Sequence, residues 1–280
     1  MTIAADHRTD IPAEAAKNSR RRLPATERGT LGISVATFSV LAALWLVATK
    51  YHWVSSLFFP SPAEVVRQFV DVATFGYADG SLLDHVLSSL GRLFAALVIG
   101  VGLGIPVGLA MGINRWARGV FSVPIDLYWG LPPLAYLPLL IIWLGIGETS
   151  KIVLLTLSTF APICFSAQAG VRSVPPERVN AALSLGANRA QIFTSIILPS
   201  ALPEILTGLR IAIGAGLSTL VAAELIAARS GIGYMIMSAA NFLAIDVVFV
   251  GLIVIAVLAF TFAFLMRLLE RRLVPWKGKL

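Results

Sequence analysis

The sequence contains a succession of long apolar runs, and this pattern constrains the fold more than any other feature. A helix needs about 20 apolar residues to cross the hydrocarbon core of a bilayer, and each run approaches or exceeds that length. Over 280 residues, 57% are hydrophobic and only 13% are charged, a composition too apolar for a soluble domain. The sequence therefore predicts an all-α integral membrane protein with six transmembrane helices. The six expected spans are residues 31–48, 86–113, 120–144, 151–170, 205–228 and 244–269.

Basic residues set the expected orientation of these spans. In the six-span arrangement, most of the 22 Lys and Arg residues fall on one side of the membrane, together with segment 1–30 and the segment after Arg267. Basic residues concentrate on the cytoplasmic side of membrane proteins, so we expect both termini to be cytoplasmic. Residues 1–30 then form a cytoplasmic tail, and residues 31–280 form the transmembrane domain.

Other classes of protein fit the sequence poorly. The net charge of +7 could indicate nucleic-acid binding, but the basic residues follow membrane sidedness instead. The single cysteine, Cys164, lies in an apolar run and is expected to be a small core residue. The sequence has no GxxxxGK[ST] loop, HExxH motif or nucleophile elbow. We therefore expect no enzymatic activity, cofactor, metal site or nucleic-acid partner. We expect membrane lipid to surround the spans.

A break in the third apolar run marks a candidate translocation path. Gly130, Pro132 and Pro133 interrupt residues 120–144, and a broken helix at membrane depth is tolerated where it lines a cavity. The fifth run adds small and hydroxyl-bearing residues and one acid, Glu224. This acid either belongs to the path, reaches the interface or pairs with another helix. The candidate path residues are Gly130, Pro132, Pro133, Gly214, Gly216, Ser218, Thr219 and Glu224.

The second apolar run carries a glycine at every fourth position, at Gly100, Gly104, Gly108 and Gly112. Such a ridge allows a neighbouring helix to approach closely because no side chain separates the two backbones. Helix packing is the expected role of these glycines. Contact with a substrate is the alternative.

The polar stretch between the fourth and fifth runs, residues 175–203, predicts two short helices. Gly186 can adopt the left-handed conformation that ends the first helix. Asn188 can cap the second helix with Gln191 as its capping-box partner, and Pro199 is expected to end it. Neither helix is long enough to cross a bilayer.

The motifs in this stretch resemble the EAA loop of bacterial ABC importer permeases. The family motif begins with Glu, whereas this chain has Asn180 at that position. In that family the paired helices seat in a groove of the ATP-binding subunit, so the resemblance implies a cytoplasmic coupling loop over residues 175–203. The residues that carry the resemblance, and therefore the expected coupling residues, are Asn180, Ala181, Ala182, Gly186, Ile196, Leu198 and Pro199.

The stretches PPLAYLPLLIIWLGIGETSKI, STLVAAELIAA and RRLVPWKG are similar to the nitrate, sulfonate and taurine group of these permeases. The resemblance implies a type I ABC importer permease (MetI-like) fold with cytoplasmic coupling helices and a core of about residues 82–270. It also implies a homodimer of permeases in a bacterial cytoplasmic (inner) membrane, two ATP-binding subunits that bind ATP and Mg, and an external solute-binding protein.

Import of a small sulfonate, with taurine first, is the function that the resemblance implies. Aliphatic sulfonates, nitrate or another small solute are the alternatives within the same group of importers. A secondary transporter is a different class, but it would use intramembrane carboxylates or histidines as ion sites and often carries inverted repeats. A membrane scaffold or sensor would need neither the broken span nor the spacing of the loop motif.

Overall fold

The computed structural model describes residues 30–51, 53, 55 and 58–276, so the expected tail lies almost wholly outside the described residues. The chain forms two compact units, residues 1–53 and 54–280. The first unit contributes one described helix, α2 (Thr30–Lys50), which is long and apolar enough to cross a membrane. The second unit contains every other described helix and all the candidate site residues.

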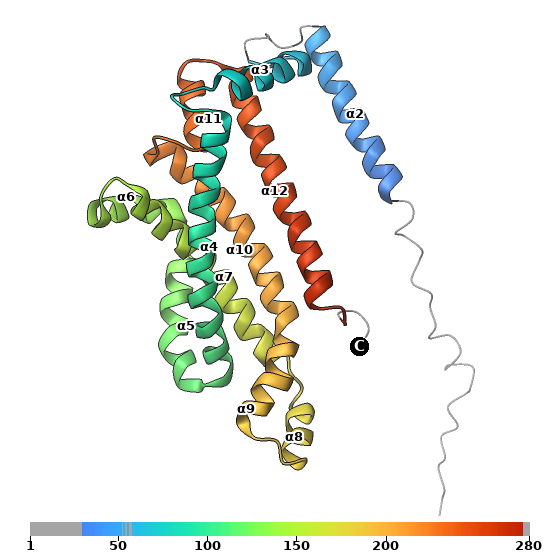
Figure 1. Ribbon diagram of the computed structural model, residues 1–280, viewed down its shortest axis with the longest axis vertical. Coiled ribbons are helices and arrows are strands. Elements are labelled where there is room, and N and C mark those ends of the chain that lie inside the picture. The colour runs from blue at the N-terminus through green and yellow to red at the C-terminus, as the bar shows by residue number, and fades with distance from the viewer. Residues whose placement is uncertain (1–29, 52, 54, 56–57, 277–280) are drawn as a thin grey trace, which may run out of the picture. The chain divides into compact units, whose positions relative to one another are not determined.

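Every element assigned in the described part of the second unit is helical, as Figure 1 shows. The helices are α3 (Pro62–Phe75), α4 (Leu82–Ile113), α5 (Arg115–Trp129), α6 (Pro133–Leu144), α7 (Glu148–Arg172), α8 (Pro176–Ser184), α9 (Arg189–Ile192), the π-helical segment η1 (Phe193–Ile197), α10 (Leu198–Ala227), α11 (Ile232–Asn241) and α12 (Ile245–Leu273).

The predicted all-α membrane fold is confirmed, and the third of the six expected spans is the broken one. In the described part of the chain, five helices are long and apolar enough to cross a membrane. The pair α5 and α6 qualifies jointly, with a bend of 103° between its members. Helices α4 and α7 run in the same direction, since Arg92 contacts Glu148 near one end and Gly112 lies beside Val171 at the other. The broken pair therefore returns the chain from one end of the unit to the other.

The same contacts define two ends of the second unit. Helix α10 runs antiparallel to α7, with Gly170 against Ala201 and Gly208 against Ser166. Helix α12 runs antiparallel to α10, and Arg210 of α10 forms an ion pair with Glu270 of α12. The turn between α4 and α5, the pair α8 and α9, and the last turn of α12 consequently share one end, whereas α3 and α11 lie at the other (Figure 1).

The glycine ridge of α4 packs against α7, as the spacing predicts. A Cβ atom on Gly104 would lie 3.0 Å from Ile163 Cγ2, and one on Gly112 would lie 2.5 Å from Val171 Cβ. A Cβ atom on Gly108 would collide with the Cys164 carbonyl oxygen. Cys164 itself is fully buried, as expected for a small core residue. The absence of side chains on α4 is therefore what allows α4 and α7 to pack closely.

Candidate functional site

Helices α8 and α9, at one end of the second unit, carry residues that the sequence predicts to form a coupling loop. Helix α8 carries Asn180, Ala181 and Ala182, and none of its residues is buried. The apolar side chains that follow are also open, with Leu183 52% and Leu185 89% exposed. These two leucines give the α8–α9 turn apolar side chains that no other described residue covers.

The turn between α8 and α9 has the geometry that its sequence predicts. Gly186 has a φ of +82°, in the left-handed region that favours glycine. The Ala187 N–H donates to the Ala182 carbonyl at 3.0 Å, and this backward hydrogen bond closes the end of α8. Asn188 then caps α9, and its backbone N–H donates to the side chain of Gln191 in a capping box. The turn therefore fixes the angle between the two helices.

The prediction that Pro199 ends the second helix is wrong. Helix α9 continues through η1 into α10, so a single helical stretch of 39 residues runs from Arg189 to Ala227. In η1 the Leu198 N–H donates to the Phe193 carbonyl, five residues earlier. This wider turn places Pro199 in the first turn of α10, where a missing N–H does little harm. Ile196 consequently lies in η1 and Leu198 is the first residue of α10, so neither belongs to a separate short helix.

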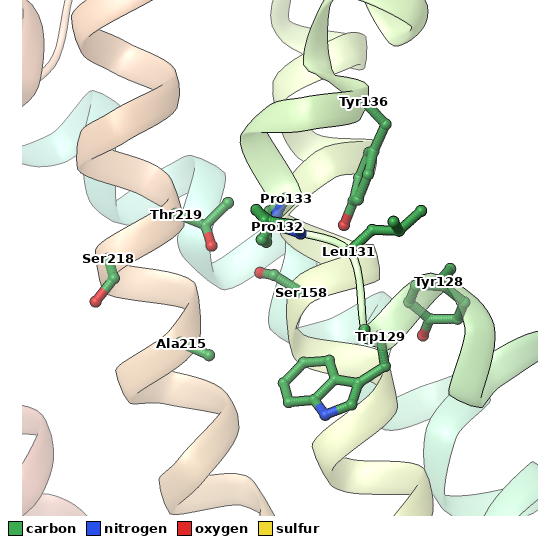
Figure 2. Close-up of a pocket in the computed structure, with 11 residues that line it drawn as sticks. Tyr128, Trp129, Leu131, Pro132, Pro133, Tyr136, Ser158, Ala215, Ser218 and Thr219 are labelled. Carbon is green, nitrogen blue, oxygen red and sulfur yellow. The ribbon is translucent and has the colours of Figure 1, made fainter.

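A cavity with a volume of about 390 Å³ lies where α5 and α6 bend apart, as Figure 2 shows. This volume falls within the range of roughly 300–1,000 Å³ that is usual for small-molecule sites. Five of the candidate path residues line it, namely Gly130, Pro132, Pro133, Ser218 and Thr219. The lining residues that the sequence did not identify are Tyr128, Trp129, Leu131, Tyr136, Ser158 and Ala215.

Three candidate path residues lie elsewhere. Gly214 is exposed, and a Cβ atom added to it would have no neighbour within 4 Å. Gly216 faces the opposite way, because a Cβ atom there would lie 2.9 Å from Leu93 Cδ1. Glu224 is 1% exposed and takes part in a separate network of charges, so its pairing with another helix is the interpretation that the structure supports.

The charged network joins four helices near the end of the unit that carries α11. Arg92 of α4 is 4% exposed, and its Nη1 donates to Glu224 Oε1 of α10 at 2.6 Å. Its Nε donates to Glu148 Oε2 of α7 at 2.5 Å, and the Lys151 ammonium lies 2.7 Å from the other oxygen of Glu148. Two positive and two negative charges are therefore paired in one cluster. The pairing compensates for the burial of Arg92, Lys151 and Glu224, whereas the Glu148 side chain remains 57% exposed.

The network also fixes the start of α11. The Gly233 N–H donates to Glu224 Oε2 at 2.9 Å, and the Ile232 N–H donates to the Ser89 hydroxyl at the same distance. Ser89 Oγ lies 2.8 Å from Glu224 Oε1, and His85 Nδ1 accepts from the Gly231 N–H. The first N–H groups of a helix lack partners within it, and a carboxylate there is favourable. Glu224 thus both pairs with Arg92 and caps α11.

The comparisons identify the class of protein. Residues 100–275 match the family described as "Binding-protein-dependent transport system inner membrane component". This match covers more than half of the chain, and the chain belongs to this family of ABC importer permeases. The resemblance seen in the loop motifs and in the broken third span is therefore confirmed at the level of the family, and the protein is a multi-pass inner-membrane subunit of a transporter.

The individual relatives are permeases. The chain is 50% identical over 266 residues to the taurine transport system permease protein TauC of Escherichia coli (strain K12), covering 94% of this chain and 96% of that protein. It is 38% identical to the putative aliphatic sulfonates transport permease protein SsuC of the same organism, covering 84% and 88%. Among solved structures, an inward facing conformation of the MetNI methionine ABC transporter aligns with a TM-score of 0.61, at 21% identity, over 69% of this chain and 95% of that chain. The structural likeness supports the fold alone.

Proposed function

We propose that this chain is the permease subunit of an ABC importer that carries a small sulfonate, taurine first, across the cytoplasmic membrane of a bacterium. The observation that carries the proposal is the 50% identity to a taurine permease over 94% of the chain. Aliphatic sulfonates are the second candidate substrate class, since the chain also shares 38% identity with a permease named for them. The difference between the two identities favours taurine.

The proposed complex contains two copies of this chain, two ATP-binding subunits and an external solute-binding protein. The exposed Leu183 and Leu185 on the α8–α9 loop give an ATP-binding subunit an apolar surface to contact. The exposed residues Gly214 and Ser218 on α10 suit close approach of a second copy, because small residues allow helices to pack closely in membranes. ATP and Mg belong to the partner subunits.

The proposed orientation places the coupling loop and both termini in the cytoplasm. The start of α5, helix α8 and the last turn of α12 lie toward the same end of the second unit (Figure 1). These elements carry Arg115, Arg118, Arg178, Arg271 and Arg272, which matches the cytoplasmic enrichment of basic residues. Helix α11 and the charged network then lie toward the external face. A solute delivered by the binding protein would enter from the end that carries α11.

Transport by this subunit would use the continuity of α9, η1 and α10. ATP hydrolysis in the partner subunits supplies the energy, and movement of the paired helices α8 and α9 is passed to α10, whose middle turns line the cavity. The cavity then opens toward one side of the membrane at a time. Both arrangements must be close in free energy, because otherwise neither the solute nor ATP could shift their populations.

Uptake by the reconstituted complex tests the proposal. Vesicles that contain the permease, its ATP-binding subunit and external binding protein should accumulate labelled taurine only when ATP is enclosed, and more than labelled nitrate or hexanesulfonate. If nitrate or hexanesulfonate is carried and taurine is not, the taurine assignment is wrong. If taurine accumulates without the ATP-binding subunit, a secondary transporter is the correct class.

The coupling loop is tested separately at Gly186. Gly186→Leu should weaken co-purification of the ATP-binding subunit, because leucine in the left-handed region costs about 1–2 kcal/mol and would redirect α9. Gly186→Asn is the matched control, since asparagine tolerates this conformation. No Cβ neighbour lies within 4 Å, so crowding does not complicate the result. If Gly186→Leu and Gly186→Asn both co-purify with the ATP-binding subunit as well as the wild-type chain does, this turn has no role in docking.

A further inference from the structure

Helix α3 carries an apolar stripe that the described residues leave exposed. The stripe consists of Val66, Phe69, Val70 and Ala73, at the i, i+3, i+4 and i+7 spacing that places side chains on one face of a helix. All four residues are exposed, with Val66 at 65% and Val70 at 53%. A helix in water normally buries such a stripe, so this one faces an apolar partner outside the described part of the chain.

The other two faces of α3 have clear surroundings. Val65 and Val72, seven residues apart, are 2% and 1% exposed, and α3 packs mainly against α12. The polar face consists of Glu64, Arg67, Asp71 and Thr74, all of them exposed. At 3.6 residues per turn, the apolar stripe lies between the buried face and the polar face. Helix α3 therefore has one face for the protein, one for water and one that suits neither.

Contacts at both ends of α3 fix it to two membrane-spanning helices. Before α3, the ring of Phe59 contacts the ring of Phe249 on α12, with the centroids 5.9 Å apart. After α3, the Tyr77 N–H donates to the Gly80 carbonyl at 2.8 Å, and Nε2 of His85 on α4 lies 2.8 Å from the Tyr77 carbonyl. Because both ends are held, α3 is not free to rotate its apolar stripe inward. The direction of the stripe is set by α4 and α12.

The contact with α12 also sets the depth of α3 in the membrane. Helix α12 begins at Ile245, so Phe249 lies about 6 Å along it at a rise of roughly 1.5 Å per residue. About one turn further on, Leu252 and Ile253 begin the exposed apolar surface of α12, which the acyl chains of a membrane can cover. Helix α3 lies crosswise to α12 (Figure 1). Its stripe therefore continues the apolar surface of α12 at the level of the lipid headgroups.

We propose that α3 is an interfacial helix whose apolar stripe inserts among the phospholipids of the outer leaflet. Interfacial helices bury their apolar face about 5–10 Å into the boundary between headgroups and acyl chains, and the contact at Phe249 holds α3 at that depth. The choice of leaflet follows from the proposed orientation, whereas the insertion does not depend on it. The lipid surface thereby helps to hold the external ends of α4 and α12 at a fixed depth.

Apolar contact, and not lipid charge, drives this insertion. The polar face of α3 carries two acids, Glu64 and Asp71, and one base, Arg67. Helices that depend on anionic lipids are instead rich in Lys and Arg on the polar face. The phospholipid that α3 contacts can therefore be zwitterionic.

Spin labelling of the permease with its ATP-binding subunits, in phosphatidylcholine nanodiscs, tests the insertion. Val66→Cys and Val70→Cys place labels on the stripe, and Arg67→Cys and Asp71→Cys are the matched controls one residue further on. Collisions with oxygen, which concentrates in lipid, and with a nickel chelate, which stays in water, measure the depth of each label. We expect the labels at 66 and 70 to lie about 5–10 Å below the lipid phosphates, and those at 67 and 71 to lie at the phosphates or above them.

Cys164 is fully buried, so the unsubstituted complex, labelled in parallel, measures the background. All four substituted residues are exposed, and ATP-driven uptake by each labelled complex establishes that it is assembled.

Three results overturn the proposal. If the labels at 66 and 70 meet the nickel chelate as often as those at 67 and 71, the stripe lies in water. If they are shielded from both reagents, protein covers the stripe, either the second copy or α2. If they reach the acyl chains only after phosphatidylglycerol is added, lipid charge drives the insertion. None of these results affects the preference for taurine that tests the proposed function.

Discussion

The two faces of α10 have different compositions and different surroundings. One face is buried against α4 and α7 and includes Gly208, Gly216 and Glu224. The other is exposed or lines the cavity and includes Gly214 and Ser218. Both faces carry glycine and polar residues, so composition does not distinguish them. What distinguishes them is whether the rest of the chain supplies partners.

This difference separates residues that stabilise the fold from residues available to a solute. On the packed face, Glu224 accepts from Arg92 and from the Gly233 N–H, and every polar contact comes from the chain itself. Beside the open face, Thr219 and Tyr136 keep hydrogen-bonding capacity that no other described residue uses. Substitutions on the packed face should therefore change stability, and those on the open face should change transport.

The largest effect is expected at the ion pair. Arg92→Leu leaves Glu224 buried without its countercharge, which typically costs about 3–5 kcal/mol. We expect a large fall in the thermal unfolding temperature of the purified complex, or no folded protein. Replacing both residues by leucine should recover part of the loss, because no unpaired charge remains. Arg229→Leu is the control at an exposed arginine. A similar fall in its unfolding temperature would show that the Arg92–Glu224 ion pair contributes no more to stability than an exposed arginine does.

A matched pair of glycines on α10 tests the packing difference. Gly208→Leu would drive a side chain into Ser166 and the Pro162 carbonyl, and overpacking of this kind costs about 1–3 kcal/mol. A Cβ atom added at Gly214 meets no atom within 4 Å, so Gly214→Leu should leave the unfolding temperature of the detergent-purified permease unchanged. Uptake should nevertheless fall for Gly214→Leu if this face lies at the path or at the second copy. Equal thermal stability of the two variants would contradict the distinction between the faces.

The smallest expected changes in stability come from removing one of two hydroxyl groups. Ser89→Ala removes a group that contacts Glu224 and accepts from the Ile232 N–H, so we expect a loss of about 1–3 kcal/mol. Thr219→Val keeps the shape of a side chain whose hydroxyl has no partner in the described residues, and should alter stability by no more than about 0.5 kcal/mol. Taurine uptake should fall for Thr219→Val. Thermal unfolding and uptake of the same preparations provide both readouts.

Much of the fold could be predicted because its determinants are local in sequence. Long apolar runs predict spans, the glycine spacing of α4 predicts close packing, and Gly186 predicts the turn between α8 and α9. Pro199 shows the limit of a local rule. A proline normally ends a helix, but a single wide turn in η1 shifts the backbone enough to accommodate it, and no residue type specifies such a turn.

The sites were less predictable because their partners are distant in sequence. Arg92 lies within the second apolar run and is buried, and its partners Glu148 and Glu224 lie 56 and 132 residues away. A charge within an apolar run was the available indication that it needs a partner. Trp129 and Tyr136 reach the cavity only because of the angle between α5 and α6, which the prolines allow but do not set.

The continuous helical stretch from Arg189 to the cavity has a mechanical consequence for the proposed coupling. At a rise of about 1.5 Å per residue, Thr219 lies roughly 45 Å along the helix from Arg189, so a tilt of about 5° at the loop displaces it by roughly 4 Å. That displacement exceeds the width of a water molecule. A small tilt of α9 would therefore produce a larger displacement of α10 at the cavity. Bending at η1, near the start of this helical stretch, can reduce that displacement.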